Sequence, residues 1–124
     1  MKAVNAYIKP HKLTEVTLAL QEMEELPGVS ISDVRGFGRQ PTGRGKRNIS
    51  EAIADYAAHL KLEVVCRDEL VDRVVEIIVK AASTGLRGDG LLYVTNVEGT
   101  VRISDGERGI QGFRSQRAGE AERE

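Results

Sequence analysis

The sequence predicts one α+β domain, because two segments with helical periodicity lie among four segments that alternate like strands. In chain order the expected elements are a strand at 2–9, a helix at 12–23, strands at 29–37 and 60–66, a helix at 68–82 and a strand within 88–97. The order β-α-β-β-α-β is that of a ferredoxin-like sandwich, with both helices on one face of an antiparallel sheet.

The two helices are predicted from apolar residues at three- and four-residue spacing. The first stripe is Leu13, Val16, Leu20 and Met23, and Pro27-Gly28 is expected to close the segment. The second stripe is Val71, Val74, Val75, Ile78 and Ala82. Asp68 is expected to cap the start of this second helix, and Gly85 is expected to stop it.

The strands carry apolar residues on both faces of the predicted sheet. Leu60, Leu62 and Val64 share one face of the third strand, while Val65 lies on the other. Because both helices cover one face, the open face needs another cover, and we expect oligomerisation there. Residues 100–104 alternate as well, and they predict a short fifth strand.

The length, charge and composition of the chain argue against several classes of function. The chain has 124 residues, a net charge of −1 and no apolar run near the roughly 20 residues that span a bilayer. We therefore expect no membrane insertion, no general attraction to nucleic acid, and a cytoplasmic protein. Cys66 stands alone, so no internal disulfide forms, and it is expected to be buried. The folded domain should cover residues 1–112, and the charged tail 113–124 should be disordered.

Two glycine-rich segments are candidate phosphate loops, although neither carries a standard motif. In residues 35–47, Gln40 and Arg47 break the Walker pattern, and Pro41 breaks the dinucleotide fingerprint. Glycines there still allow close backbone approach, and Arg39 has the fork geometry that binds phosphate. The second segment, 84–90, has the composition of an anion-binding nest. Each segment taken alone is also typical of an ordinary turn.

Catalysis and nucleic-acid recognition are poorly supported. The third strand lacks the exposed aromatic residues on which RNA-recognition sheets stack bases. His11 and His59 lie in contexts that suggest no shared site, and no cluster has metal-ligand spacing. We expect no catalytic residue and no nucleic-acid partner.

Four segments together resemble a known family. "AYIKPHKLTEV", "VRGFGRQ", "VDRVVEIIVKAASTGLRGDGLLYV" and "VRISDGERG" occur in order over residues 1–110, and the combination is similar to the PII (GlnB-like) nitrogen-regulatory signal proteins. The resemblance implies a homotrimer that binds ATP or ADP in clefts between subunits. It also implies that a T-loop reports energy state, and often 2-oxoglutarate, to partner proteins.

The resemblance also assigns residues to roles. It places the T-loop at about 38–58, the B-loop at 84–90 and the C-loop at 102–108. Nucleotide contacts are assigned to Ser30, Gly36, Phe37, Gly38, Arg39, Gln40, Glu63, Val65, Gly88, Asp89, Gly90 and Arg102. Gln40 would also contact magnesium where a magnesium nucleotide binds. The expected effectors are ADP, AMP or ATP, with no obligatory cofactor. In the T-loop, Arg44, Lys46 and Arg47 are expected to contact a transporter or a metabolic enzyme.

The sequence departs from the family pattern at four ligand positions. Leu91 replaces a basic residue that pairs with phosphate, Ser104 replaces the second C-loop arginine, and Leu86 stands where many members have lysine. His59 replaces a lysine associated with 2-oxoglutarate. Each lost charge-assisted phosphate contact is worth roughly 1.5–3 kcal/mol, so ADP or AMP should bind better than ATP.

The T-loop departs as well. Ala52 occupies the position of the tyrosine that many members carry as a modification site, so that switch is absent here. Ser50 falls where some cyanobacterial members are phosphorylated, but its flanking residues differ. The leading hypothesis is a non-catalytic, trimeric, nucleotide-binding regulator. The alternative is a protein of the same fold that has lost nucleotide sensing and responds to another small ligand or a partner.

Overall fold

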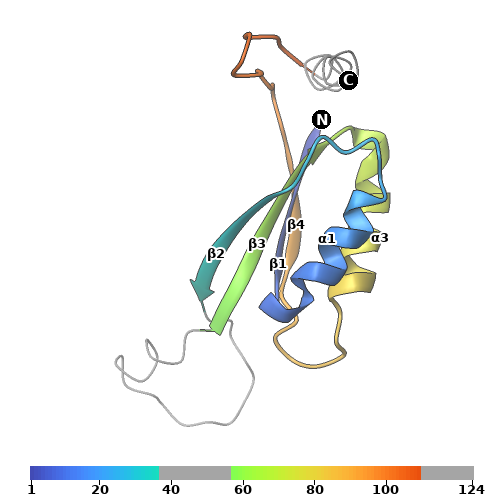
Figure 1. Cartoon of the computed structure of the whole chain (residues 1–124), viewed down its shortest axis with the longest axis vertical. Helices are drawn as coiled ribbons and strands as arrows, with labels where there is room; N and C mark the ends of the chain where they lie inside the picture. The colour runs from blue at the N-terminus through green and yellow to red at the C-terminus, as the bar shows by residue number, and fades with distance from the viewer. Residues whose placement is uncertain (37–56, 110–124) are drawn as a thin grey trace.

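The protein forms a four-stranded antiparallel sheet with two helices on one face (Figure 1). The computed structural model describes residues 1–36 and 57–109. The elements are β1 (Lys2–Ile8), η1 (Pro10–Lys12), α1 (Leu13–Gln21), β2 (Ser30–Gly36), β3 (Ala57–Cys66), η2 (Asp68–Leu70), α3 (Val71–Ala82) and β4 (Leu92–Asn96). The strand order is β2-β3-β1-β4, which confirms the predicted α+β class and the β-α-β-β-α-β connectivity.

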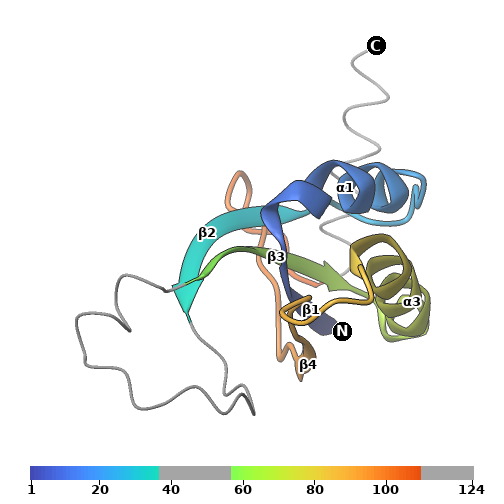
Figure 2. The same ribbon diagram turned by 90° about the horizontal axis from the view of Figure 1, so that it is seen from below.

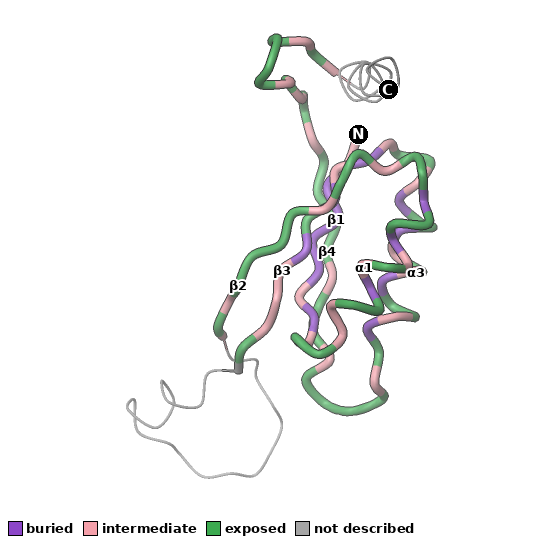
Figure 3. Tube along the Cα trace, viewed as in Figure 1, coloured by how far each residue is buried: buried purple, intermediate pink, exposed green. Residues whose placement is uncertain are grey.

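The core lies between the sheet and the paired helices. Figure 2 shows α1 and α3 side by side over the same face of the sheet. Val4, Ala6 and Ile8 point to this face from β1, where they meet Leu62 and Val64 of β3. The other buried core residues are Val16 and Leu20 of α1, Met23 just after α1, and Val71, Val74, Ile78 and Ala82 of α3. The apolar stripes of the sequence therefore predicted the buried faces of both helices (Figure 3).

The opposite face of the sheet carries both polar and apolar side chains, and no helix of residues 1–36 or 57–109 covers it (Figure 2). Tyr7 and Tyr93 lie side by side there with ring centroids 6.3 Å apart, and the Lys61 ammonium sits 6.0 Å from the centre of the Tyr7 ring. Asn5 is buried among these neighbours, and its side-chain amide donates to the Ala3 carbonyl at 3.3 Å. Tyrosine and lysine keep polar tips in water over apolar bodies, so this face is suited to an interface as well as to solvent.

Four local predictions were wrong. Asp68 does not cap α3, because the chain first makes the short helix η2 and the Asp68 carboxylate pairs with the Met1 amino group at 2.6 Å. Neither predicted helix stop is correct: α1 ends at Gln21, before Met23 and Pro27-Gly28, and α3 ends at Ala82, before Gly85. Residues 100–104 form no strand of the sheet, because Val101 makes an isolated bridge with Arg108 instead. In addition, β3 begins at Ala57, before the apolar run that predicted it.

Candidate functional site

The B-loop joins α3 to β4 and is closed around the Asp89 carboxylate. That carboxylate accepts hydrogen bonds from the Thr84 amide at 2.9 Å, the Gly85 amide at 3.2 Å and the Thr84 hydroxyl. The Thr84 hydroxyl oxygen in turn accepts a hydrogen bond from the Leu86 amide at 3.1 Å. Residues 84–90 therefore form a structured turn whose first two backbone amides are bound by the carboxylate of Asp89.

Lys9, at the end of β1, holds the same carboxylate. Its ammonium lies 3.2 Å from Asp89 Oδ1 and 3.4 Å from Thr84 Oγ1. The Thr84 hydroxyl first, and then the Thr84 amide and Lys9, lower the pKa of Asp89 to about 2. Asp89 is therefore ionised at neutral pH, and its oxygens are used in bracing the loop.

Gly90 seats the loop against β1. Its φ is 115°, and a Cβ atom there would lie 1.8 Å from the Tyr7 carbonyl oxygen. The next residue continues the contact, since the Tyr7 amide donates to the Leu91 carbonyl at 2.8 Å. Only glycine has both the backbone freedom and the missing side chain that this approach requires.

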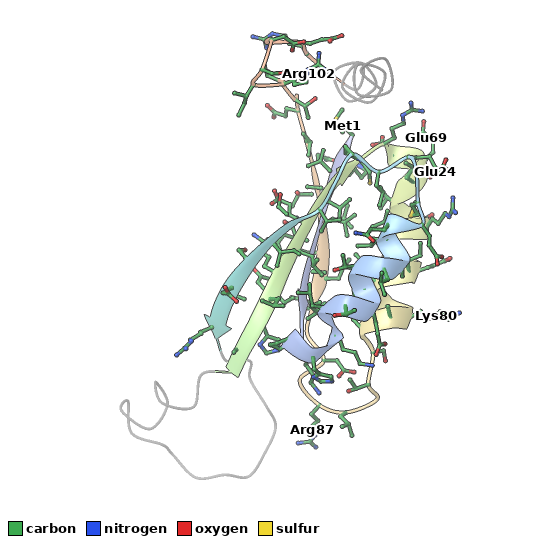
Figure 4. All side chains as sticks on the ribbon, viewed as in Figure 1. Met1, Glu24, Glu69, Lys80, Arg87 and Arg102 are labelled. Carbon is green, nitrogen blue, oxygen red and sulfur yellow. The ribbon has the colours of Figure 1, made fainter. Side chains whose placement is uncertain are left out.

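His59 fastens the tip of the loop to β3. Its Nε2 atom lies 3.2 Å from the Gly88 carbonyl oxygen, and Gly88 itself has a φ of 81°. The B-loop and the residue that follows it are thus held by two neighbouring strands, by Tyr7 of β1 and by His59 of β3. Its outer surface carries Leu86 and Leu91, which are 71% and 66% exposed, and the labelled Arg87 projects from its tip in Figure 4.

The C-loop forms a hairpin that follows β4. The Arg102 amide donates to the Glu107 carbonyl at 2.8 Å, and the Gly109 amide donates to the Thr100 carbonyl at 2.9 Å. The Arg102 guanidinium contacts both carboxylates of the hairpin, with Nε 3.0 Å from Asp105 Oδ1 and Nη2 2.8 Å from Glu107 Oε2. This guanidinium, together with the Glu107 amide, lowers the pKa of Asp105 to about 2.

The predicted adenine contacts lie together on the open face of the sheet. Ser30 stands opposite Glu63 in the register of β2 and β3, and Val65 follows two residues later on the same face. Gly36 lies at the other end of β2, about 20 Å away for six strand steps. The Gly36 end of β2 and the B-loop lie at the same end of the sheet (Figure 1).

The chain does not bring all the predicted contacts to one place. Figure 4 shows Arg87 of the B-loop and Arg102 of the C-loop at opposite ends of the molecule. One chain therefore cannot apply both loops to the same phosphate group. The predicted contacts Phe37, Gly38, Arg39, Gln40, Arg44, Lys46 and Arg47 lie outside the described residues.

The described residues contain neither a cluster of metal ligands nor a membrane-spanning helix. Within residues 1–36 and 57–109, no three His, Cys, Asp or Glu side chains gather as metal ligands would. The same two segments contain no helix long and apolar enough to cross a membrane.

Three residues that hold the B-loop in place were not identified from the sequence. Lys9, Thr84 and Tyr7 hold the B-loop through its ion pair, its hydroxyl and its backbone seat. Thr84 had a local signal, since a hydroxyl residue five positions before an aspartate can close a turn. The other two contacts join segments about 80 residues apart, and no local pattern indicates them.

The described residues form a single α+β domain, and its glycine-rich B-loop is held against β1 and β3 at one end of the sheet. The family model described as "Nitrogen regulatory protein P-II" matches residues 1–107. A protein of that name from Bradyrhizobium diazoefficiens is 43% identical over 110 residues, which cover 89% of this chain and 97% of the relative. The protein of the same name from Rhizobium meliloti is 44% identical, again over 89% of this chain and 97% of the relative. That from Microchaete diplosiphon is 42% identical over 90% of this chain and 98% of its own.

The chain therefore belongs to the nitrogen regulatory protein P-II family, which confirms the resemblance drawn from its sequence motifs. The relatives are named as regulatory proteins, in agreement with the expectation of a signalling role.

Proposed function

We propose that this protein is a non-catalytic P-II regulator that binds an adenine nucleotide between the copies of a cytoplasmic homotrimer. Through residues 38–58 it would act on a transporter or a metabolic enzyme of nitrogen or carbon metabolism. Family membership supports the regulatory role, because the relatives at 42–44% identity are named nitrogen regulatory proteins.

One observation carries the nucleotide part of the proposal: a pre-built glycine loop and an arginine loop stand at opposite ends of one chain. The B-loop is braced internally by Asp89, so its outer surface is fixed before any ligand arrives. Pre-organised backbone amides in glycine loops are suited to phosphate. A second copy, offering its C-loop to this B-loop, would complete the set of contacts.

The charges of the described loops favour a nucleotide with few phosphates. Lys9 is paired with Asp89, and Arg102 is paired with Asp105 and Glu107. A phosphate must share these cations with carboxylates, and the positions of Leu91 and Ser104 supply none. We expect ADP or AMP to bind more tightly than ATP, since each additional phosphate adds charge that lacks a partner.

Calorimetry on the purified full-length protein tests this function. ADP, AMP and ATP are titrated with and without magnesium, because Gln40 is expected to contact the metal of a magnesium nucleotide. Arg87→Ala, at the loop tip, should weaken ADP binding, whereas Arg73→Ala, an exposed arginine of α3, should not. Sedimentation should show a trimer. The absence of heat with all three nucleotides at millimolar concentration would contradict the proposal.

A second function is favoured by the exposed apolar residues. Ile103 is 99% exposed in the C-loop, and Leu86 and Leu91 are exposed on the B-loop. Exposed apolar residues are better fitted to protein contact than to phosphate. In this alternative the protein binds its partner without sensing nucleotide. Partner binding that is identical with and without millimolar ADP would support the alternative over the first function.

A further inference from the structure

The bond between His59 and Gly88 links two parts of the molecule that are distant in sequence. His59 lies on β3 opposite Val34 of β2, near the start of the described part of that strand. Its Nε2 atom is 3.2 Å from the carbonyl oxygen of Gly88 in the B-loop. As a hydrogen bond to a carbonyl, the contact has the ring nitrogen as its donor.

This bond fixes the orientation of one peptide unit. Gly88 has a φ of 81°, which is open to glycine, and the described peptide bonds are all trans. In a trans peptide the C=O and N–H groups point in opposite directions. When His59 holds the Gly88 carbonyl, the Asp89 amide N–H must therefore point away from β3. Without that bond, the glycine leaves the peptide free to rotate.

Backbone amides are the donors that a phosphate at the B-loop would depend on most, because few cations of the described loops lack a carboxylate partner. Leu91 offers no charge, Lys9 is already engaged with the Asp89 carboxylate, and Arg102 is engaged with two carboxylates of its own hairpin. The direction of each amide in the loop 84–90 thus decides how many donors a phosphate meets.

We propose that His59 is a positioning residue for the B-loop: it holds the Gly88–Asp89 peptide so that the Asp89 amide is presented to the terminal phosphate of a nucleoside diphosphate. This proposal rests on the proposed function and names a determinant of phosphate affinity in the same site. Because His59 belongs to β3, the bond also couples the state of the loop to the β2–β3 hairpin.

Two substitutions separate positioning from general structure. His59→Ala removes the donor, while His59→Gln restores an N–H group at a similar reach. We expect His59→Ala to lower ADP affinity roughly ten- to hundredfold, which is the effect of one hydrogen bond to a charged group. Adenosine, which has no phosphate, should bind both variants like the wild type. His59→Gln should recover most of the ADP affinity, and His11→Ala, at an exposed histidine, should change nothing.

Amide spectra of the nucleotide-free protein provide a second readout. We expect the Asp89 amide signal to move in His59→Ala and to return toward its wild-type position in His59→Gln. Unchanged ADP affinity together with an unmoved Asp89 amide would overturn the proposal, as would an equal loss of ADP and adenosine binding. If the wild type bound no nucleotide, the proposed function would fail first. The Asp89 amide would then decide whether His59 orients the peptide.

Discussion

The B-loop and the C-loop both contain an aspartate held by close hydrogen bonds, but their supports differ. Asp89 is held partly by Lys9 from β1, while Tyr7 and His59 fasten other points of its loop to the sheet. Asp105 is held by Arg102 within its own hairpin. The B-loop is therefore stabilised by contacts with the sheet, whereas the C-loop is stabilised by contacts among its own residues.

The difference bears on where a ligand site can form. A loop fixed by the sheet keeps its geometry in a single chain, and here it lies at the same end of the sheet as the end of β2 (Figure 1). The hairpin projects from the far end, with Ile103 in solvent. A ligand that needs both loops therefore needs two copies of the chain.

Gly90→Ala should give the largest effect, because it drives a methyl group into the Tyr7 carbonyl. Overpacking together with a strained φ should destabilise the fold by about 3 kcal/mol and remove detectable ADP binding. Urea unfolding and calorimetry measure the two losses.

Two other glycines serve as matched controls for that prediction. Gly85→Ala meets open space at a φ of 77° and should cost only about 1 kcal/mol. Gly99→Ala meets open space without a positive φ and should be nearly neutral. If all three variants were equally stable, the seat of the B-loop on β1 would be contradicted.

Leu91→Lys should restore a cation beside the B-loop without disturbing its support, because this side chain is exposed. One charge-assisted phosphate contact is worth roughly 1.5–3 kcal/mol, so ATP affinity should rise at least tenfold and ADP affinity should rise less. Calorimetry with both nucleotides measures the change. Leu18→Lys, at an exposed leucine of α1, provides the same change of charge elsewhere and should leave both affinities unaltered.

Acid should release both loops, since Asp89 and Asp105 have pKa values lowered to about 2. A lowered folded-state pKa means that the unfolded chain binds more protons. The stabilisation is thus present above the unfolded pKa near 4 and is lost as the pH falls toward 2. Amide signals of Gly85 and Glu107 should shift over that range. Asp105→Asn should abolish the transition of Glu107 and spare that of Gly85, and a simultaneous loss of both would contradict the independence of the two loops.

Ile103→Ser should give the smallest effect on an isolated chain. A side chain that is 99% exposed contributes little to a single fold, so unfolding at low protein concentration should change by less than about 0.5 kcal/mol. At high concentration a larger loss is expected if a second copy covers the hairpin. Urea unfolding over a dilution series measures both. A large loss that is independent of concentration would show that Ile103 packs within its own chain.

The sequence predicted those parts of the fold that depend on periodic burial. The stripes of α1 and α3 and the apolar alternation of β3 lie in the core as expected, because a 3.6- or 2-residue period is a local signal of a buried face. Asp68 was misassigned as a cap because its partner, the Met1 amino group, is 67 residues away. Val101 alternates like a strand residue, yet its bridge lies within the hairpin.

The sequence indicated which residues form the loop but not what holds each of them in place. Gly88, Asp89 and Gly90 lie in the connection between the second helix and the last strand, as the sequence indicated, and their nucleotide contacts stay a prediction. The roles of Asp89 as an internal brace and of Gly90 as a seat depend on Lys9 and Tyr7, which meet the loop only after the sheet forms. Likewise, the B-loop precedes β4 and the C-loop follows it, so the direction of β4 places the two loops at opposite ends of the molecule (Figure 1). The spacing of the motifs in the sequence does not indicate this direction.

Complementation between copies tests the central claim most directly, that the B-loop of one copy and the C-loop of another share one nucleotide. Leu91→Glu and Ser104→Glu each place a carboxylate at an exposed position, one on the B-loop and one on the C-loop, so both chains should fold but bind ADP poorly. Co-expression with two different tags allows mixed assemblies to be purified and titrated with ADP. We predict that mixed assemblies regain binding, because some clefts then combine two unaltered loops. Mixed assemblies that bind ADP no better than either parent would contradict the claim.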